Sequence, residues 1–236
     1  MSLTFKNEIP YIEEQSIIEL IDSIPTPFYV YSQNKIIDTY NHLKKTLNKE
    51  IYFAVKANSN QAIITLMHSL GLGADVVSIE EMHRALKAKI PPNKIIFEGV
   101  GKSRADIANA ITQNIKQINI ESIEELKNIN SIAITLNKQQ SIGLRINPDI
   151  DGNTLSKIST GRKSDKFGID FNQLKEVCEL IKTLHNISLN GLSCHIGSQI
   201  FEITVFEKTF KKVKEAINLF KSNNLNIDHL NLGGGF

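Results

Sequence analysis

A lysine directly follows a short apolar segment in the first quarter of the chain. The segment Tyr52–Val55 is typical of a β-strand, and Lys56 comes at its carboxyl end. In a parallel α/β barrel, that end is where reactive groups gather. Partial desolvation there favours the neutral amine, which is the form that attacks an aldehyde. Lys56 is therefore a candidate Schiff-base lysine, with a solvated lysine at a strand end as the alternative.

Three consecutive glycines follow another apolar segment near the end of the chain. Gly233, Gly234 and Gly235 come after Asp228–Leu232. Without side chains, they let the backbone approach a ligand and turn successive N–H groups toward an anion. Phosphate sites in barrels often use the loops after the seventh and eighth strands. We interpret the glycines as a candidate phosphate loop, with a plain tight turn as the alternative.

A histidine and a serine follow a third apolar segment, Leu189–Cys194. The ring of His195 could stack on an aromatic cofactor, and Ser198 could donate a hydrogen bond to a phosphate. A structural role is the alternative for the histidine. Cys194 beside it suggests a metal, but one Cys–His pair has too few ligands for zinc, so we predict no metal site.

Two charged residues, Asp75 and Arg145, lie within predicted strands. A charge that points into a barrel needs a partner. The two could form a structural ion pair with each other, or they could contact a ligand, and both interpretations remain open.

A lysine, a phosphate loop and a stackable ring on one barrel face are the groups that pyridoxal 5′-phosphate (PLP) needs. The cofactor carries the difficult chemistry, whereas the protein supplies the amine, the phosphate clamp and the electrostatics. The sequence therefore predicts a PLP site.

Seven short apolar runs alternate with helical patterns along the chain, which predicts parallel strands joined by helices. Several of the helical segments begin with capping-box residues, such as Ser78 with Glu81 and Ser122 with Glu125. The fold class that we expect is an α/β barrel of the PLP-binding (β/α)8 type, with about seven βα units and no eighth strand in the chain as given. The seven runs are Ile51–Val55, Ala74–Val77, Lys94–Phe97, Gln117–Ile120, Ile142–Ile146, Leu189–Cys194 and Asp228–Leu232.

The composition is that of an ordinary globular protein, with 41% apolar and 22% charged residues among 236. A net charge of +2 gives no reason to expect nucleic acid or a membrane as partner. Two cysteines and no apparent signal peptide favour the cytoplasm. We expect residues 1–32 to be an N-terminal extension with one strand, Phe28–Tyr31, and residues 33–236 to be the barrel domain.

Short motifs from about Pro27 to Phe236 resemble one family, the group-IV PLP-dependent decarboxylases with alanine-racemase-like barrels. His195–Gln199 (HIGSQ) favours its diaminopimelate decarboxylase branch over its ornithine branch. The other motifs are Tyr52–Asn58 (YFAVKAN), Ala74–Ser78 (ADVVS), Gly99–Ser103 (GVGKS), Leu144–Pro148 (LRINP), Ile158–Gly161 (ISTG), Lys166–Ile169 (KFGI) and Leu232–Phe236 (LGGGF).

The resemblance implies decarboxylation of meso-2,6-diaminopimelate to L-lysine, a step of lysine biosynthesis, by a homodimer with a shared active site. It implies that the lysine binds PLP covalently, the histidine stacks on its ring, and the serine and glycines bind its phosphate. The residues that it places at the cofactor are Lys56, His195, Ser198, Gly233, Gly234, Gly235, Arg145 and Asp75.

The chain departs from the family pattern at two motifs and at its end. Leu155–Lys157 stand where the family often has His-Pro-Tyr, and Ile79 and Glu80 stand where it often has two glycines. The family continues into an eighth strand and a C-terminal β domain. We therefore expect the chain as given to be truncated, unstable or dependent on a partner fragment, and to have little activity alone.

Two other functions stay open on the sequence. The substrate could be another basic amino acid, such as ornithine, arginine or carboxynorspermidine. The chain could also be an inactive truncated product or a PLP-binding decoy.

Overall fold

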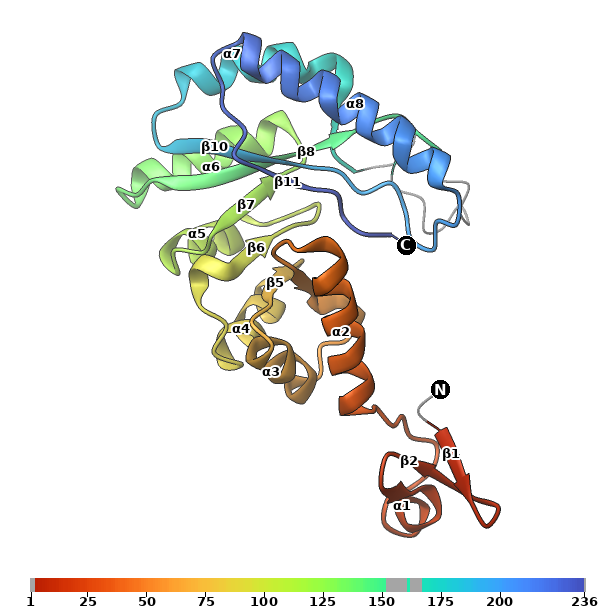
Figure 1. Ribbon diagram of the computed structural model, residues 1–236. Helices are drawn as coiled ribbons and strands as arrows, with labels where there is room; N and C mark the ends of the chain where they lie inside the picture. The colour runs from red at the N-terminus through yellow and green to blue at the C-terminus, as the bar shows by residue number, and fades with distance from the viewer. Residues whose placement is uncertain (1–2, 152–160, 162–166, 236) are drawn as a thin grey trace. The chain divides into compact units, whose positions relative to one another are not determined.

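The computed structural model describes residues 3–151, 161 and 167–235, and the chain divides into two compact units, Met1–Ile51 and Tyr52–Phe236 (Figure 1). In the first unit, an antiparallel sheet is formed by β1 (Leu3–Lys6), β2 (Ile9–Ile12) and β3 (Gln15–Ser16). Two helices follow, α1 (Ile17–Ser23) and α2 (Gln33–Leu47). The Ser32 hydroxyl accepts a hydrogen bond from the Lys35 amide at 3.0 Å, which caps the start of α2.

The strand predicted at Phe28–Tyr31 is wrong, because this segment belongs to no sheet. An apolar run becomes a strand only where a neighbour completes its hydrogen bonds, and no described strand pairs with it. The strands of the first unit come earlier and are three in number, each of four residues or fewer. The domain boundary at residue 33 stays a prediction.

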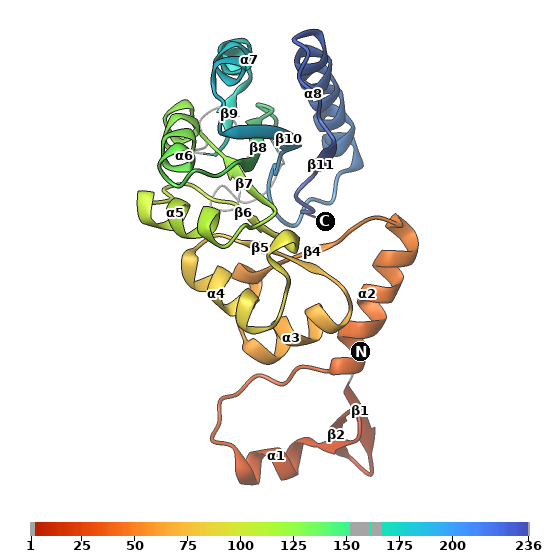
Figure 2. The ribbon, with the colours of Figure 1, turned by 90° about the vertical axis from the view of Figure 1, so that its left-hand side faces the viewer.

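The second unit is built on a curled sheet of seven parallel strands, with its helices on the outer side (Figures 1 and 2). Each of the seven predicted strands is present, in the order β11-β10-β8-β7-β6-β5-β4, and a short β9 pairs with β8. The prediction of an α/β barrel with about seven units is confirmed. The strands are β4 (Tyr52–Ala54), β5 (Gly73–Val76), β6 (Ile95–Phe97), β7 (Gln117–Ile120), β8 (Gln140–Asn147), β9 (Ile169–Asp170), β10 (Ile187–Ser193) and β11 (His229–Asn231).

Two helices of this unit begin at side-chain caps predicted from the sequence. Ser78 accepts a hydrogen bond from the Glu81 amide at 3.3 Å, and Ser122 accepts one from the Glu125 amide at 3.1 Å. None of the described helices is long and apolar enough to cross a membrane. The helices are α3 (Gln61–Ser69), α4 (Ile79–Lys87), α5 (Arg104–Thr112), α6 (Ile123–Thr135), α7 (Leu174–Thr183) and α8 (Ile203–Ser222), with 3-10 turns at Val55–Ala57, Pro92–Lys94 and Phe171–Gln173.

The two faces of the curled sheet differ in polarity. Side chains such as Val76, Ile118 and Leu144 belong to the buried apolar core that includes residues of the helices. Their strand neighbours carry polar groups, among them Gln117 and Asn119, which are buried although polar. Because residues alternate between faces along a strand, this places one polar layer inside the curl. The inner face is therefore equipped to hold a polar ligand.

The sheet ends at β4 on one side and β11 on the other. No further described strand pairs with the outer edge of either. The expectation that the chain is unstable alone stays a prediction.

Candidate functional site

A cavity of about 630 Å³ lies at the carboxyl ends of the strands in the second unit. Its volume is in the usual range for a cofactor or small-molecule site. Of the eight residues proposed from the sequence, all but Gly234 line it. The cavity also brings in groups that the sequence argument missed, including Glu98, Phe167, Ser193 and Asn231.

Lys56 enters the cavity from a tight turn. The chain leaves β4 into the 3-10 turn Val55–Ala57, which buries Val55 and leaves Lys56 exposed on the cavity side. The expected partial desolvation of the amine is therefore wrong for this structure, because the side chain is open to solvent. Its place at the cavity wall agrees with the prediction.

The three glycines adopt a backbone that other residues rarely adopt. Their φ angles are 76°, 81° and 91° for Gly233, Gly234 and Gly235. A Cβ atom at Gly233 would lie 2.6 Å from Nδ1 of His195, and one at Gly235 would collide with the carbonyl oxygen of Gly197. The loop thus packs directly against the segment that carries His195, which a plain tight turn does not require.

Backbone hydrogen bonds join the glycine loop to the His195 segment. Cys194 N donates to the carbonyl of Asn231 at 2.9 Å, and Ile200 N donates to that of Gly235 at 2.8 Å. The Asn231 side chain accepts a hydrogen bond from Gly233 N at 2.9 Å. The histidine ring and the glycine loop therefore hold fixed positions on one side of the cavity.

His195 is half-buried beside this loop. Desolvation, together with the positive charges of Arg145 and Lys56, lowers the pKa of His195 to about 4. The ring is therefore neutral at pH 7 and suited to stacking rather than to ion pairing. Burial raises the pKa of the neighbouring Cys194 to about 12, so this residue is a thiol.

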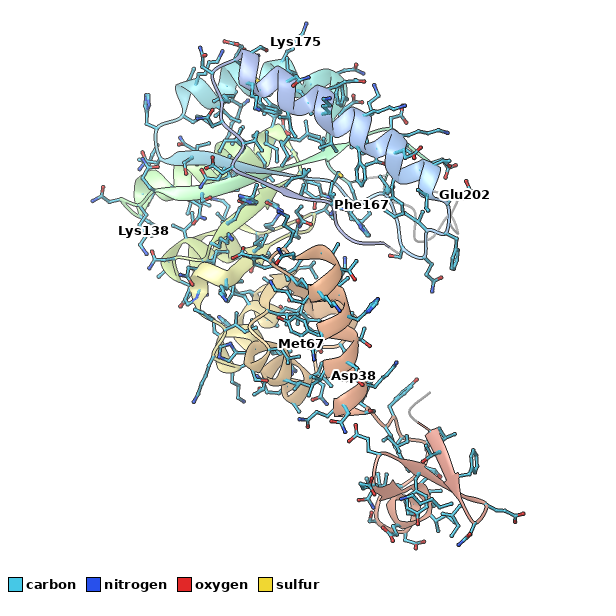
Figure 3. The ribbon with its side chains drawn as sticks, viewed as in Figure 1. Asp38, Met67, Lys138, Phe167, Lys175 and Glu202 are labelled. Carbon is cyan, nitrogen blue, oxygen red and sulfur yellow. The ribbon has the colours of Figure 1, made fainter. Side chains whose placement is uncertain are left out.

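Arg145 pairs with Glu121, a residue that the sequence argument missed. Nη1 of Arg145 donates to Oε1 of Glu121 at 3.1 Å, and both side chains are buried. The guanidinium carbon lies 4.7 Å from the centre of the Phe167 ring, on the inner side of the sheet (Figure 3). The predicted alternative of an ion pair between Arg145 and Asp75 is thus wrong, because Arg145 pairs with Glu121, and contact of the two residues with a ligand stays a prediction.

A buried lysine supports the acid that holds Arg145. Lys102 Nζ donates to Glu125 Oε1 at 2.8 Å and to two backbone carbonyls, those of Gly99 and Asn119. The other oxygen of Glu125 accepts a hydrogen bond from Glu121 N at 2.8 Å. This network fixes the loop after β6 and the end of β7.

Two further acids, Asp75 and Glu98, line the cavity from neighbouring strands. Burial and the charge of Glu98 raise the pKa of Asp75 to about 8, although Lys56 and Arg145 oppose this. Burial also raises the pKa of Glu98. Glu98 and Glu121 each follow a predicted strand directly, as Lys56 does, and this shared position was the signal that could have found them.

The residues present fit PLP. The cavity offers an accessible amine, a neutral flat ring and a glycine loop with left-handed backbone. It also contains buried polar atoms without a hydrogen-bond partner among the described residues, namely Asp75 Oδ1, Glu98 Oε2 and Ser193 Oγ. Such atoms are expected where a polar ligand completes the hydrogen bonding.

Some predicted motifs fall outside the described residues. These are Leu155–Lys157, Ile158–Thr160 of ISTG, Lys166 of KFGI and Phe236.

Comparison with known proteins agrees with the site. Residues 33–236 match the family model described as "pyridoxal-dependent decarboxylase, pyridoxal binding domain". The diaminopimelate decarboxylase of Haemophilus influenzae is 38% identical over 234 residues, which cover 98% of this chain and 56% of the relative. That of Helicobacter pylori is 39% identical over 220 residues, which cover 92% and 54%.

Solved structures give the same result. Diaminopimelate decarboxylase from M. jannaschii in complex with L-lysine matches with a TM-score of 0.90 and 34% identity, covering 100% of this chain and 57% of that one. The Helicobacter pylori enzyme in complex with L-lysine matches with a TM-score of 0.86 and 38% identity, covering 89% and 54%. The chain spans about half the length of the curated relatives that it matches.

Proposed function

Because the chain belongs to the pyridoxal-dependent decarboxylases and contains their pyridoxal-binding domain, we propose that the protein converts meso-2,6-diaminopimelate to L-lysine and CO2. The observation that carries the proposal is one cavity lined by Lys56, His195 and the glycine loop. Support for the substrate comes from relatives that are 38% and 39% identical and bear the name diaminopimelate decarboxylase.

The residues of this cavity divide the work of holding the cofactor. PLP, when bound, supplies an aldehyde for covalent attachment and an electron-withdrawing ring. Lys56 would provide the attaching amine, and the neutral ring of His195 would stack on the cofactor. Ser198 and the backbone N–H groups of Gly234 and Gly235 would bind the phosphate, because successive N–H groups in such a turn form an anion-binding concavity.

Arg145 and Asp75 act near the cofactor. Arg145 is fixed by Glu121 and Phe167, so its positive charge has a defined place on the cavity wall. That charge, with the amine of Lys56, favours anionic groups in the cavity. Overall, the bond between the α-carbon and a carboxyl group of the substrate breaks, CO2 leaves, and a proton is added to that carbon.

Location and assembly are part of the same proposal. We place the protein in the cytoplasm, where lysine biosynthesis needs it, and we expect a homodimer with a shared active site. Size-exclusion chromatography with light scattering measures the dimer directly, and a monomer that releases CO2 at full rate would contradict it.

The test begins with cofactor trapping. The full-length protein is incubated with PLP, reduced with borohydride and digested, and we expect the pyridoxyl group on the peptide that contains Lys56. Lys56→Ala removes the label, whereas the control Lys175→Arg, on the outer side of α7, retains it (Figure 3). Label scattered over surface lysines in place of Lys56 would contradict the proposed site and favour an inactive chain.

The substrate is tested separately by CO2 release. We expect release from meso-diaminopimelate and much less from ornithine, arginine or carboxynorspermidine at equal concentration. Preferential release from one of these three would keep the cofactor site and replace the substrate.

A further inference from the structure

The two oxygens of Glu98 have different surroundings. Glu98 follows β6, is 7% exposed and lines the cavity. Oε1 accepts hydrogen bonds from the side-chain amides of Asn119 and Asn231, the latter at 3.4 Å. Oε2 has no hydrogen-bond partner among the described residues. One oxygen thus accepts two donors, while the other is buried without any donor or acceptor among the described residues.

No cation within the described residues forms an ion pair with Glu98. Arg145 pairs with Glu121, and Lys102 pairs with Glu125. An ionised carboxylate that is buried without an ion-pair partner is strongly disfavoured relative to the neutral acid. A neutral acid avoids this cost. Its carbonyl oxygen accepts the two amide donors, and its hydroxyl oxygen then acts as a donor.

We propose that Glu98 is a neutral carboxylic acid in this site and that its Oε2 hydroxyl donates a hydrogen bond to an anionic oxygen of the bound ligand. The proposal rests on the pyridoxal-binding role of the cavity. Two sources supply such an oxygen, the ring hydroxyl of the cofactor and a carboxylate of the substrate. The donor chemistry is the same for both, and the second experiment distinguishes them.

Burial of Glu98 favours the neutral acid, whereas most of the surrounding charge opposes it. Burial, the largest cause, raises the pKa of Glu98, and the nearby carboxylate of Glu121 adds to this. Arg145, the Asn119 hydrogen bond and Lys102 act in the opposite direction.

Asp75, on the neighbouring strand β5, is also an acid whose pKa is raised by burial. The pKa of Asp75 is raised to about 8 by burial, by Glu98 and by Glu81 on α4, against Lys56 and Arg145. On the β10 side, Cys194 is a thiol and His195 is neutral at pH 7. With Glu98 neutral, burial remains the largest cause that raises the pKa of Asp75.

The first experiment needs no ligand and does not depend on PLP binding. The full-length protein is labelled with carbon-13 at glutamate side-chain carboxyls only, so that Asp75 does not contribute, and its carbon spectrum is recorded at pH 7. We expect one neutral carboxyl signal that is absent in Glu98→Gln and present in the control Glu80→Gln, an exposed acid on α4. A spectrum with only ionised glutamates, or a neutral signal that persists in Glu98→Gln, overturns the proposal even if PLP still labels Lys56.

The second experiment compares two variants in PLP binding and in substrate KM. Glutamine keeps an acceptor oxygen and an N–H donor, so Glu98→Gln should weaken PLP binding or raise the substrate KM by at most about threefold. Glu98→Ala should change the same quantity by about tenfold. Equal losses in the two variants would mean that the negative charge matters, and would overturn the proposal. So would the absence of any loss in Glu98→Ala.

Comparing PLP affinity with substrate KM also identifies which ligand oxygen accepts the hydrogen bond from Glu98. A loss in affinity for PLP that disappears with a PLP analogue lacking the ring hydroxyl assigns the donor to the cofactor. A loss confined to substrate KM assigns it to the substrate carboxylate. Thermal unfolding of both variants, followed by circular dichroism, shows whether a loss reflects misfolding, and the carbon spectrum decides the protonation state in either case.

Discussion

The guanidinium of Arg145 is held by the carboxylate of Glu121 at 3.1 Å, with both groups buried at the wall of the cavity. The second oxygen of Glu121 accepts a hydrogen bond from Gly168 N at 3.1 Å. One acid from the end of β7 therefore fixes a cation on β8 and the backbone that leads into β9.

Breaking this pair should strongly destabilise the protein. Glu121→Ala leaves the Arg145 charge buried without its partner, which costs about 3–5 kcal/mol in the free energy of unfolding. Urea denaturation measures the loss. The double variant Glu121→Ala with Arg145→Met should recover part of it, because no charge is then left unpaired. A double variant that is less stable than the sum of the two single losses would contradict this account.

Two neighbouring glycines offer a matched pair of substitutions. Gly233→Ala and Gly234→Ala both force an alanine into a left-handed backbone, with φ of 76° and 81°, at a cost of about 1–2 kcal/mol each. Only the Cβ at 233 meets His195, whereas the Cβ at 234 meets nothing within 4 Å. We expect Gly233→Ala to be clearly less stable in thermal unfolding and to bind PLP more weakly. Equal effects would mean that the contact with His195 is unimportant.

Asp75 should make stability fall as the pH rises. Its pKa is about 8 in the folded protein against 3.8 for an unperturbed aspartate, so between these pH values the folded state holds a proton that the unfolded state has lost. The free energy of unfolding therefore decreases with pH, by up to about 1.4 kcal/mol per unit. Urea unfolding between pH 6.5 and 8 should show this slope, and Asp75→Asn should reduce it. The exposed control Asp228→Asn should leave it unchanged.

His195 should make the free energy of unfolding rise with pH, the opposite of the effect of Asp75, in a lower pH range. Its pKa is about 4 in the folded protein and 6.5 for an unperturbed histidine, so between these pH values the unfolded state binds a proton that the folded state does not. Stability from this group is complete above pH 6.5 and is lost as the pH falls toward 4. In wild type it offsets the contribution of Asp75 over this window. His195→Gln should therefore expose a falling stability from pH 4 upward, and a profile equal to wild type would contradict the assignment.

The strand positions could be predicted from the sequence because each strand is a short apolar run bounded by polar residues. β7 was predicted to the residue, at Gln117–Ile120, whereas β8 runs from Gln140 to Asn147 and is longer than expected. Its polar ends are buried by neighbouring strands, which no local pattern shows. The strand prediction for Phe28–Tyr31 was wrong because no described strand lies beside this apolar segment to pair with it.

The residues of the candidate site also divide into those that the sequence could predict and those that it could not. Lys56, His195 and the glycines were predictable because the residue types suggest their chemistry and each follows a strand. Glu98 and Glu121 were missed because a single acid after a strand is usually solvated. The pairing of Arg145 with Glu121 rather than Asp75 depends on side-chain directions across the sheet, and these directions are set by tertiary packing.

Backbone hydrogen bonds join residues 194–200 to residues 231–235, two segments that are separated in the sequence by α8. Substitutions in one segment should be tolerated only with compatible residues in the other, so we expect the two segments to vary together among relatives. Exchanging only one of them with a relative should impair the protein more than exchanging both together. Redesign of this pyridoxal-binding domain for a new cofactor analogue would therefore have to replace both segments at once.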